Sequence, residues 1–374
     1  MTTLSHRFHW SVLASAGVLT LILGLALAAP ATAASHLNCY QQTNLVSNIP
    51  NLATHTDANL VNAWGLASSA ASPFWVSDNG TGVTTLYNGE GEPFPVGTPL
   101  VVTIPPTGSA PTGQVFNKFN AMSPSDFVVA DHPSLFIFAT EDGTISAWNL
   151  FVTPLTAAVL VVDNSASGAV YKGLAIGSSA AGNFLYAANF HAGTIDVFNG
   201  KFAPVVLPLG AFFDPEIPAG FAPFNIQNLG DQLYVTYAKQ NDAKHDDVAG
   251  EGNGFVDVFD TNGNFLQSVA ADGRLNSPWG LALAPADFGP FSNDVLVGNF
   301  GDGRINAYRQ LGGEFSFHGK LRDANDAPIT IDGLWALRFG NGSSNSGPTN
   351  TLFFTAGPNH EQNGLFGSLD ACLP

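Results

Sequence analysis

The chain has 374 residues, of which 45% are hydrophobic and only 11% are charged. This composition excludes intrinsic disorder, which requires many charges and few apolar residues. Lys and Arg total 12 against 29 acidic residues, a net charge of −17. Nucleic acid is therefore excluded as a partner, because neutralising phosphates requires a basic surface. The 40 glycines, 24 prolines and 29 phenylalanines favour an all-β protein with many turns.

Residues 1–34 have the pattern of a secretory signal peptide. Arg7 supplies the positive charge, residues 11–29 are an apolar run, and residues 31–33 read Ala-Thr-Ala, a small-residue cleavage site. The alternative is a retained membrane anchor, because a run of this length can span a bilayer. No Lys or Arg lies between Arg7 and Lys118, so the run lacks a positive flank that would stop transfer. We predict a signal peptide at 1–34 and a secreted domain at 35–374 without membrane contact after cleavage.

The only two cysteines, Cys39 and Cys372, lie near opposite ends of the secreted domain. An even pair in an oxidising compartment predicts a disulfide between them. Two unpaired thiols are the alternative that the residues alone leave open.

One pattern recurs six times along the chain. The third strand of each unit is expected to end in an aromatic residue, at positions 87, 148, 198, 259, 308 and 366. The preceding strands are small-residue segments such as 62–67 and apolar segments such as 135–138. Turns such as Asp142-Gly143 connect the strands. Each unit is long enough for four short strands.

Such units expose apolar surface on both faces, and a closed ring buries all of these faces without leaving an uncovered end. We therefore predict an all-β, six-bladed β-propeller with the small residues of the first strands at the crowded axis. Residues 40–46 remain as a strand that would pair with the last blade, which would bring Cys39 beside Cys372. Two β-sandwiches are the alternative, but they do not explain a sixfold recurrence without a linker.

The Trp-Gly-Leu-Ala segments at 64–67 and 279–282, with residues 297–305, resemble NHL-type and gluconolactonase-like six-bladed propellers. The chain is also similar to a family of uncharacterised exported bacterial propeller proteins, in motifs at residues 59–66, 74–80, 139–145, 244–250 and 363–367. This resemblance implies the fold of nearly the whole secreted domain and no particular activity. Likeness to gluconolactonases implies an axial divalent metal that activates a lactone.

Four oxygen-bearing residues at the ends of the second strands are candidate metal ligands: Asp78, Glu141, Asn189 and Asn299. If they converge on the axis, they would hold Ca²⁺ or another divalent cation, which takes six to eight oxygen ligands. The alternative is that each side chain caps a turn by accepting backbone hydrogen bonds. We expect no other cofactor.

A second group of residues is expected to contact a ligand at one mouth of the central channel. Five lie on the first strands, namely Trp64, Lys172, Gln227, Trp279 and Trp335, and four lie on loops, namely His245, Asp246, Asp247 and His360. A histidine beside carboxylates suits a metal site or a base that works near neutral pH. A solvated acidic loop and surface histidines are the alternative.

The sequence thus predicts a secreted propeller that binds a small molecule, glycan or protein at the mouth of its channel. The alternative is a metal-dependent hydrolase of the lactonase kind, whose catalytic residues remain unknown. Carboxylates that converge on the axis would favour the hydrolase, whereas aromatic and neutral polar side chains would favour binding. A serine hydrolase is not expected, because the chain has no Gly-x-Ser-x-Gly motif.

Overall fold

The computed structural model describes residues 38–271 and 273–372, so the predicted signal peptide at 1–34 lies outside the described residues. Over these two ranges the chain forms 26 β-strands and two short 3₁₀ turns. No helix in the described ranges has the length and apolar character needed to cross a membrane.

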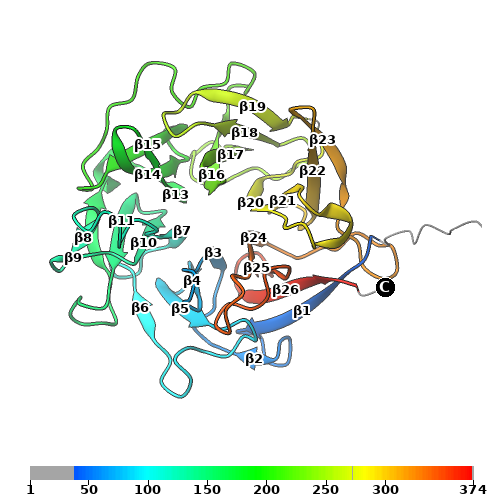
Figure 1. The fold of residues 1–374 in the computed structure, drawn as a ribbon, viewed down its shortest axis with the longest axis horizontal. Coiled ribbons are helices and arrows are strands. Elements are labelled where there is room, and N and C mark those ends of the chain that lie inside the picture. The colour runs from blue at the N-terminus through cyan, green and yellow to red at the C-terminus, as the bar shows by residue number, and fades with distance from the viewer. Residues whose placement is uncertain (1–37, 272, 373–374) are drawn as a thin grey trace, which may run out of the picture. The chain divides into compact units, whose positions relative to one another are not determined.

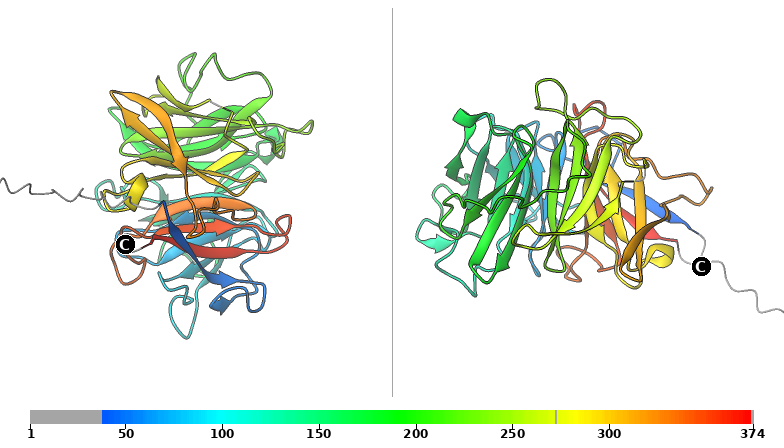
Figure 2. Two further views of the ribbon diagram at one scale, coloured as in Figure 1. Left: turned by 90° about the vertical axis from the view of Figure 1, so that its right-hand side faces the viewer. Right: turned by 90° about the horizontal axis from the view of Figure 1, so that it is seen from above.

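Six small antiparallel sheets surround a common axis, and the first strand of each lies nearest to that axis (Figure 1). The first strands are β3 (Ala63–Ala67), β7 (Pro111–Phe116), β13 (Tyr171–Ser179), β16 (Phe221–Leu229), β20 (Pro278–Leu283) and β24 (Leu334–Phe339). The second strands are β4 (Phe74–Asp78), β10 (Phe136–Thr140), β14 (Gly182–Asn189), β17 (Gln232–Lys239), β21 (Val295–Asn299) and β25 (Leu352–Ala356). The strands run obliquely between the two faces of the ring (Figure 2).

The third strands are β5 (Val83–Tyr87), β11 (Thr144–Trp148), β15 (Thr194–Asn199), β18 (Gly254–Phe259), β22 (Ile305–Leu311) and β26 (Leu365–Ala371). Outer strands follow in four blades: β6 (Val101–Thr103), β12 (Val159–Asp163), β19 (Phe265–Ala270) and β23 (Glu314–Lys320). A small separate hairpin consists of β8 (Val128–Val129) and β9 (His132–Pro133). This arrangement confirms the predicted all-β, six-bladed propeller.

The N-terminal strand β1 (Tyr40–Ser47) completes the last blade. It pairs antiparallel with β26, with Tyr40 opposite Ala371 and Ser47 opposite Leu365, and β2 (His55–Thr56) then pairs parallel with β1. A disulfide joins Cys39 to Cys372, whose Cα atoms lie 5.4 Å apart. Both the predicted closure of the ring and the predicted disulfide are therefore confirmed.

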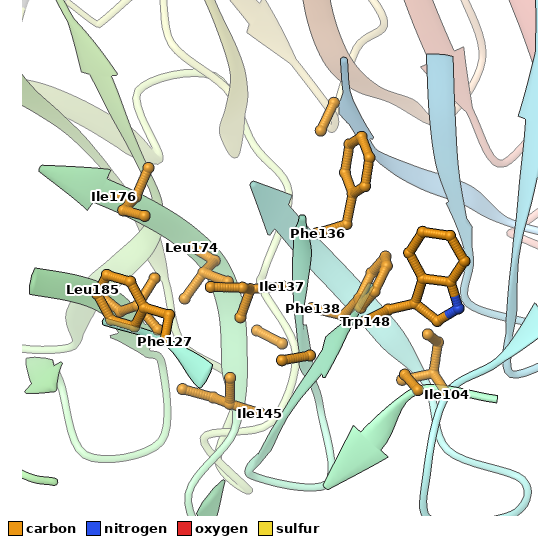
Figure 3. Packing of buried hydrophobic residues seen from close by; sticks show 14 of the residues in the cluster. Ile104, Phe127, Phe136, Ile137, Phe138, Ile145, Trp148, Leu174, Ile176 and Leu185 are labelled. Atoms are coloured by element: carbon orange, nitrogen blue, oxygen red, sulfur yellow. The ribbon is translucent and has the colours of Figure 1, made fainter. Parts of the chain in front are cut away.

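The apolar core lies between neighbouring blades. Ile137 and Phe138 of β10, Trp148 of β11 and Leu174 of β13 belong to one such buried cluster (Figure 3). All five residues of β10 are buried, as expected for a strand covered on both faces. Because each sheet buries both faces against its neighbours, a single blade has no core of its own.

Glycines let the first strands approach one another at the axis. A Cβ atom added at Gly173 of β13 would lie 2.7 Å from the Cα atom of Asn225 on β16, and one added at Gly113 of β7 would lie 2.7 Å from the carbonyl carbon of Gly173. Separations below 3.0 Å are not tolerated by real side chains, so only glycine fits. This packing confirms the expectation of small residues at a crowded axis.

Candidate functional site

Six equivalent residues mark one end of the axis. Each directly follows a second strand, and its backbone N–H donates to the carbonyl of the residue directly before the first strand of the same blade. The donor and acceptor pairs are Asn79–Asn62, Glu141–Ala110, Phe190–Val170, Gln240–Gly220, Phe300–Ser277 and Gly357–Gly333. Polar residues from these loops gather here, and we call this end the Lys172 mouth, formed by Asn62, Asn79, Glu141, Lys172, His245, Asp246, Asp247 and Glu361.

The floor of the Lys172 mouth is aromatic. Trp64 and Trp335 stack with ring centroids 3.6 Å apart, and Trp279 meets both rings edge-on at about 6 Å. None of the three is more than 4% exposed, and Phe300 stacks on Trp335 at 4.0 Å. The structure thus brings the three predicted tryptophans together, but they form a buried aromatic cluster beneath the polar residues.

Lys172 lies at the centre of the mouth. Its side chain is 3% exposed, its Nζ atom bonds the Glu141 carboxylate, and the Oδ1 atom of Asp246 lies 3.4 Å away. The ammonium also lies 5.3 Å from the ring centroid of Trp64, within cation–π range. Burial acts to lower the pKa of Lys172, but the charges of Glu141 and Asp246 prevail and raise it above its usual value. Lys172 is therefore a buried cation held by two carboxylates from different blades.

A chain of side-chain amides connects Glu141 to a second acid, Glu361. Nδ2 of Asn79 donates to Glu141 at 2.9 Å, and Nδ2 of Asn62 donates to Oδ1 of Asn79 at 3.1 Å and to Glu361 at 2.7 Å. Oδ1 of Asn62 in turn accepts from Nε1 of Trp335 at 2.9 Å. The hydrogen bonds orient the two carboxylates above the aromatic floor.

The carboxylates outnumber the single ammonium. Burial raises the pKa of Glu361, and the negative charge of Glu141 adds to the effect. Burial also raises the pKa of Asp247, against the lowering influence of Lys172. Glu141, Asp246, Asp247 and Glu361 surround one lysine, so the mouth carries an excess of negative charge whenever these acids are ionised.

His245 and Asp246 come from the loop between β17 and β18. Gln240 and Asp247 form an isolated β-bridge that folds this loop back, and Nε2 of Gln240 donates to the carbonyl of Phe190 at 2.5 Å. Nδ1 of His245 lies 2.8 Å from Asp246. Burial acts to raise the pKa of Asp246, but hydrogen bonding by His245 and the charge of Lys172 lower it overall.

Glu141, His245 and Asp246 each offer one ligand atom, and these atoms all lie within 4.8 Å of one another. Two carboxylates and an imidazole are donors that suit a divalent cation. Lys172 contacts both of these carboxylates, so its ammonium already provides positive charge at this place. A metal ion here would share or replace the contacts of Lys172.

The predicted metal ligands do not converge. Glu141 reaches the Lys172 mouth, but Asp78 is completely buried within its blade, where burial raises its pKa well above the usual value. Nδ2 of Asn189 donates to Asp196 at 3.0 Å and its Oδ1 accepts from the N–H of Ala192 at 3.2 Å. Nδ2 of Asn299 donates to the carbonyl of Arg274. Asn189 thus has the turn-capping role that was the alternative.

Sequence reasoning missed three residues of the mouth, of which Asn79 and Glu361 directly follow residues that it selected and Asn62 directly precedes β3. Asn79 follows Asp78, and Glu361 follows the exposed His360. Phe190 and Phe300, which follow Asn189 and Asn299, join the aromatic cluster beneath the mouth. Glu141 could have pointed to them, because it directly follows a second strand. The equivalent position in each other blade, one residue after the second strand, was therefore the place to search.

Gln227 lies in the central channel and not among the residues of the Lys172 mouth. It lines a cavity of about 190 Å³ to which the first strands of all six blades contribute, together with Arg338 on β24. Nε and Nη2 of Arg338 donate to the side chain and carbonyl of Ser68, at 3.0 and 2.9 Å. Trp279 lines both this cavity and the aromatic floor, so the tryptophans separate the cavity from the mouth.

Fold and site together define a six-bladed β-propeller with an acidic cluster at one mouth of its axis. No protein-family model matches the chain. The chain is 33% identical over 331 residues to uncharacterized protein R648 of Acanthamoeba polyphaga mimivirus, covering 87% of this chain and 78% of that protein. It is 33% identical over 333 residues to uncharacterized protein L690 of the same virus, covering 87% and 84%. The chain therefore belongs to one family with these viral proteins.

Solved structures resemble the chain in fold alone. A glucose dehydrogenase has a TM-score of 0.55 with 11% identity and covers 89% of this chain and 100% of its own. The soluble aldose sugar dehydrogenase of Escherichia coli has a TM-score of 0.52 with the same identity and coverage. The sequence relatives named above are viral, so membership of an exported bacterial family stays a prediction.

Proposed function

We propose that this protein is a secreted β-propeller whose Lys172 mouth binds a small, positively charged ligand. The observation that carries the proposal is the gathering of four carboxylates around one ammonium. Glu141 follows β10, Asp246 and Asp247 precede β18, and Glu361 precedes β26, so three blades contribute acids. The ligand class that this charge favours is a divalent metal ion or a small organic ammonium compound.

Solvent access supports binding at the outer side of the cluster. The side chains of His245 and Asp246 are 46% and 61% exposed, whereas that of Lys172 is 3% exposed. A ligand would therefore meet the carboxylate oxygens and the imidazole first, with Lys172 holding Glu141 and Asp246 in place from below. A glycan or protein that carries a cationic group would bind by the same contacts.

Export is part of the same proposal. The disulfide between Cys39 and Cys372 is typical of extracellular or periplasmic proteins, because the cytosol keeps thiols reduced. The signal-peptide pattern at 1–34 supports the same compartment.

Calorimetric titration of the purified protein with CaCl₂, ZnCl₂ and 1,4-diaminobutane tests the ligand class. We expect saturable binding of one of these cations, weakened at least about tenfold by Glu141→Gln or Asp246→Asn. Asp231→Asn is the matched control, because Asp231 pairs with the exposed Lys118 outside the mouth. The absence of saturable binding for all three cations, or equal binding by the Glu141 and Asp231 variants, would contradict the proposal.

A metal-dependent hydrolase of the lactonase kind is the second candidate. It is favoured by one observation, the triad of Glu141, His245 and Asp246 within 4.8 Å. A divalent metal held by this triad would polarise a carbonyl and acidify a bound water, and Asp247, which is not part of the triad, would accept the proton that leaves the water. This candidate requires a stoichiometric metal in the purified protein and a lower melting temperature in chelator. If the purified protein contains no metal and its melting temperature does not change in chelator, the hydrolase candidate is contradicted and only the binding function remains.

A further inference from the structure

Blade 3, which consists of β13, β14 and β15, has an incomplete outer edge. In the other five blades the third strand has an antiparallel partner on its outer side: β6 on β5, β12 on β11, β19 on β18, β23 on β22, and β1 on β26. In blade 3 the sheet ends at β15, which has only β14 as a strand partner in the described part of the chain.

The segment after β15 pairs with the outer edge of that strand only over its first few residues. After the turn, the N–H of Asn199 donates to the carbonyl of Ala203 at 2.9 Å, and the N–H of Val205 donates to that of Val197 at 2.8 Å. Beyond Val205 the chain leaves the edge, and Phe212 packs against both Tyr186 of β14 and Phe259 of β18 in the next blade. Residues 194–196 of β15 thus have no strand on their outer side.

A groove of about 720 Å³ occupies the place of the missing strand. It is lined on one side by residues 193–198 and on the other by residues 204, 205, 207 and 209–213. Two large apolar side chains of the lining are exposed, because Leu209 is fully exposed and Phe213 is 62% exposed. Such a patch beside an unpaired strand edge is the usual arrangement of a site that accepts an added β-strand.

The charge around the groove selects the partner. Asp196 lines the groove, and the exposed Asp163 directly precedes the lining residue Asn164. The nearby Lys201 donates to the carbonyl of Ser125 instead. A second copy of this chain, with its net charge of −17, would be repelled, whereas a basic segment would be attracted.

We propose that the outer edge of β15 binds an extended segment of a partner protein in which apolar residues alternate with lysine or arginine, as the fourth strand of blade 3. The strand β23 shows this chemistry within the same chain, because Phe315 and Phe317 face the core and alternate with more exposed residues. The partner's apolar residues would fill the groove, and its basic residues would meet Asp196 and Asp163. This site lies on the outer strand of its blade and is independent of the Lys172 mouth.

The test uses a fluorescein-labelled peptide of sequence KFTVKVTK and the complete secreted domain. We expect saturable binding by fluorescence anisotropy, weakened at least about tenfold by Leu209→Lys, which removes an apolar contact and adds repulsion. Leu311→Lys is the matched control, because Leu311 is also exposed (66%) but lies on β22. Since Leu209 is fully exposed, its substitution should leave the melting temperature unchanged.

Two further peptides separate strand addition from simple attraction. EFTVEVTE reverses the charge, and KFTPKPTK carries prolines, which have no N–H group to donate to the strand edge. We expect both to bind at least about tenfold more weakly than KFTVKVTK. Equal binding of either peptide, no binding of KFTVKVTK, or an unchanged affinity of the Leu209 variant would overturn the proposal. A concentration-dependent dimer of the protein that Leu209→Lys abolishes would assign the edge to a second copy and would overturn it as well.

Discussion

Asp78 and Asn79 are neighbours in the chain, but only Asn79 reaches the Lys172 mouth. Successive side chains of an extended strand point to opposite faces, so a displacement of one residue exchanges an interior position for a mouth position. His360 and Glu361 also differ by one position, but they lie in the turn between β25 and β26, where both residues have positive φ angles. Sequence patterns locate the end of a strand to within one or two residues, which is too coarse to decide between such neighbours.

Asp257 illustrates an acid whose role is internal to a blade. It lies on β18 with no exposed surface, and burial raises its pKa to about 7, with the charge of Asp214 adding to the effect. In the unfolded chain the pKa of Asp257 is the ordinary value of 3.8, which is well below its pKa in the folded protein. Between these values the unfolded state binds fewer protons, so the contribution of Asp257 to stability falls as the pH rises.

Asp257→Asn is therefore expected to change the pH dependence of unfolding. In the wild type this carboxyl lowers the free energy of unfolding by up to about 4 kcal/mol as the pH rises from about 4 to 7. The variant loses this slope, which urea denaturation at a series of pH values measures. Asp260→Asn is the control with the opposite sign: burial acts to raise the pKa of Asp260, but its hydrogen bonds to Asn264 and Asn262 lower it overall. Parallel pH profiles for wild type and Asp257→Asn would refute the assignment.

At the scale of elements, the first strands are limited by how closely they approach the next blade. Gly173 and Gly177 both lie on β13, but their surroundings differ. A Cβ at Gly173 would meet the backbone of Asn225, whereas one at Gly177 would first meet the ends of side chains, at 3.1 Å and beyond. Side-chain ends can move aside, but the backbone of a neighbouring strand cannot without disturbing its blade.

Gly173→Ala is expected to lower the free energy of unfolding by about 1–3 kcal/mol, the usual cost of forcing an extra carbon into a packed core. Gly177→Ala makes the same change on the same strand and is expected to stay within about 0.5 kcal/mol of the wild type. Chemical denaturation of both variants measures the difference. Equal losses would show that the approach of β13 to β16 does not limit the residue at 173.

The strands that could be predicted from the sequence are those with an unambiguous local pattern. The six aromatic residues at 87, 148, 198, 259, 308 and 366 all lie in third strands, and β5, β11 and β18 end at theirs as predicted, whereas β15, β22 and β26 continue beyond it. The first strand β7 was not identified, because its segment lacks the Trp-Gly-Leu-Ala pattern, and β16 was anticipated only through Gln227. The missing fourth strand of blade 3 was not foreseen either. Residues 205–207 are apolar, but Pro204 and Pro208 flank them, and a proline has no N–H to give to a sheet.

At the scale of the whole molecule, the ring is closed twice, by the pairing of β1 with β26 and by the disulfide. Closure could be predicted because it follows from counting strands and needs no side-chain detail. The Lys172 mouth could be predicted only in part. Glu141, Lys172 and Asp246 come from three different blades, and the ion pairs that join them depend on the rotation of each blade about the axis, which no local pattern encodes.

Reduction of the disulfide is expected to destabilise the ring without changing its fold. The bond joins residues separated by 333 positions, and loop closure on this scale contributes about 5–6 kcal/mol in the chain-entropy description. Calorimetric melting with and without a phosphine reductant measures the loss. The double variant Cys39→Ser with Cys372→Ser should melt at the lower temperature in both buffers. An unchanged melting temperature after complete reduction of the wild type, shown by thiol titration, would contradict this expectation.

The pairing of β1 with β26 also sets an order of events during biosynthesis. Tyr40 is synthesised early, and its strand partner Ala371 is added more than three hundred residues later. Throughout that interval β1 lacks the neighbour that completes its sheet, while blades in the middle of the chain already have all their own strands. Assembly can therefore start in the interior of the chain, and the first strand to be made is among the last to acquire its place.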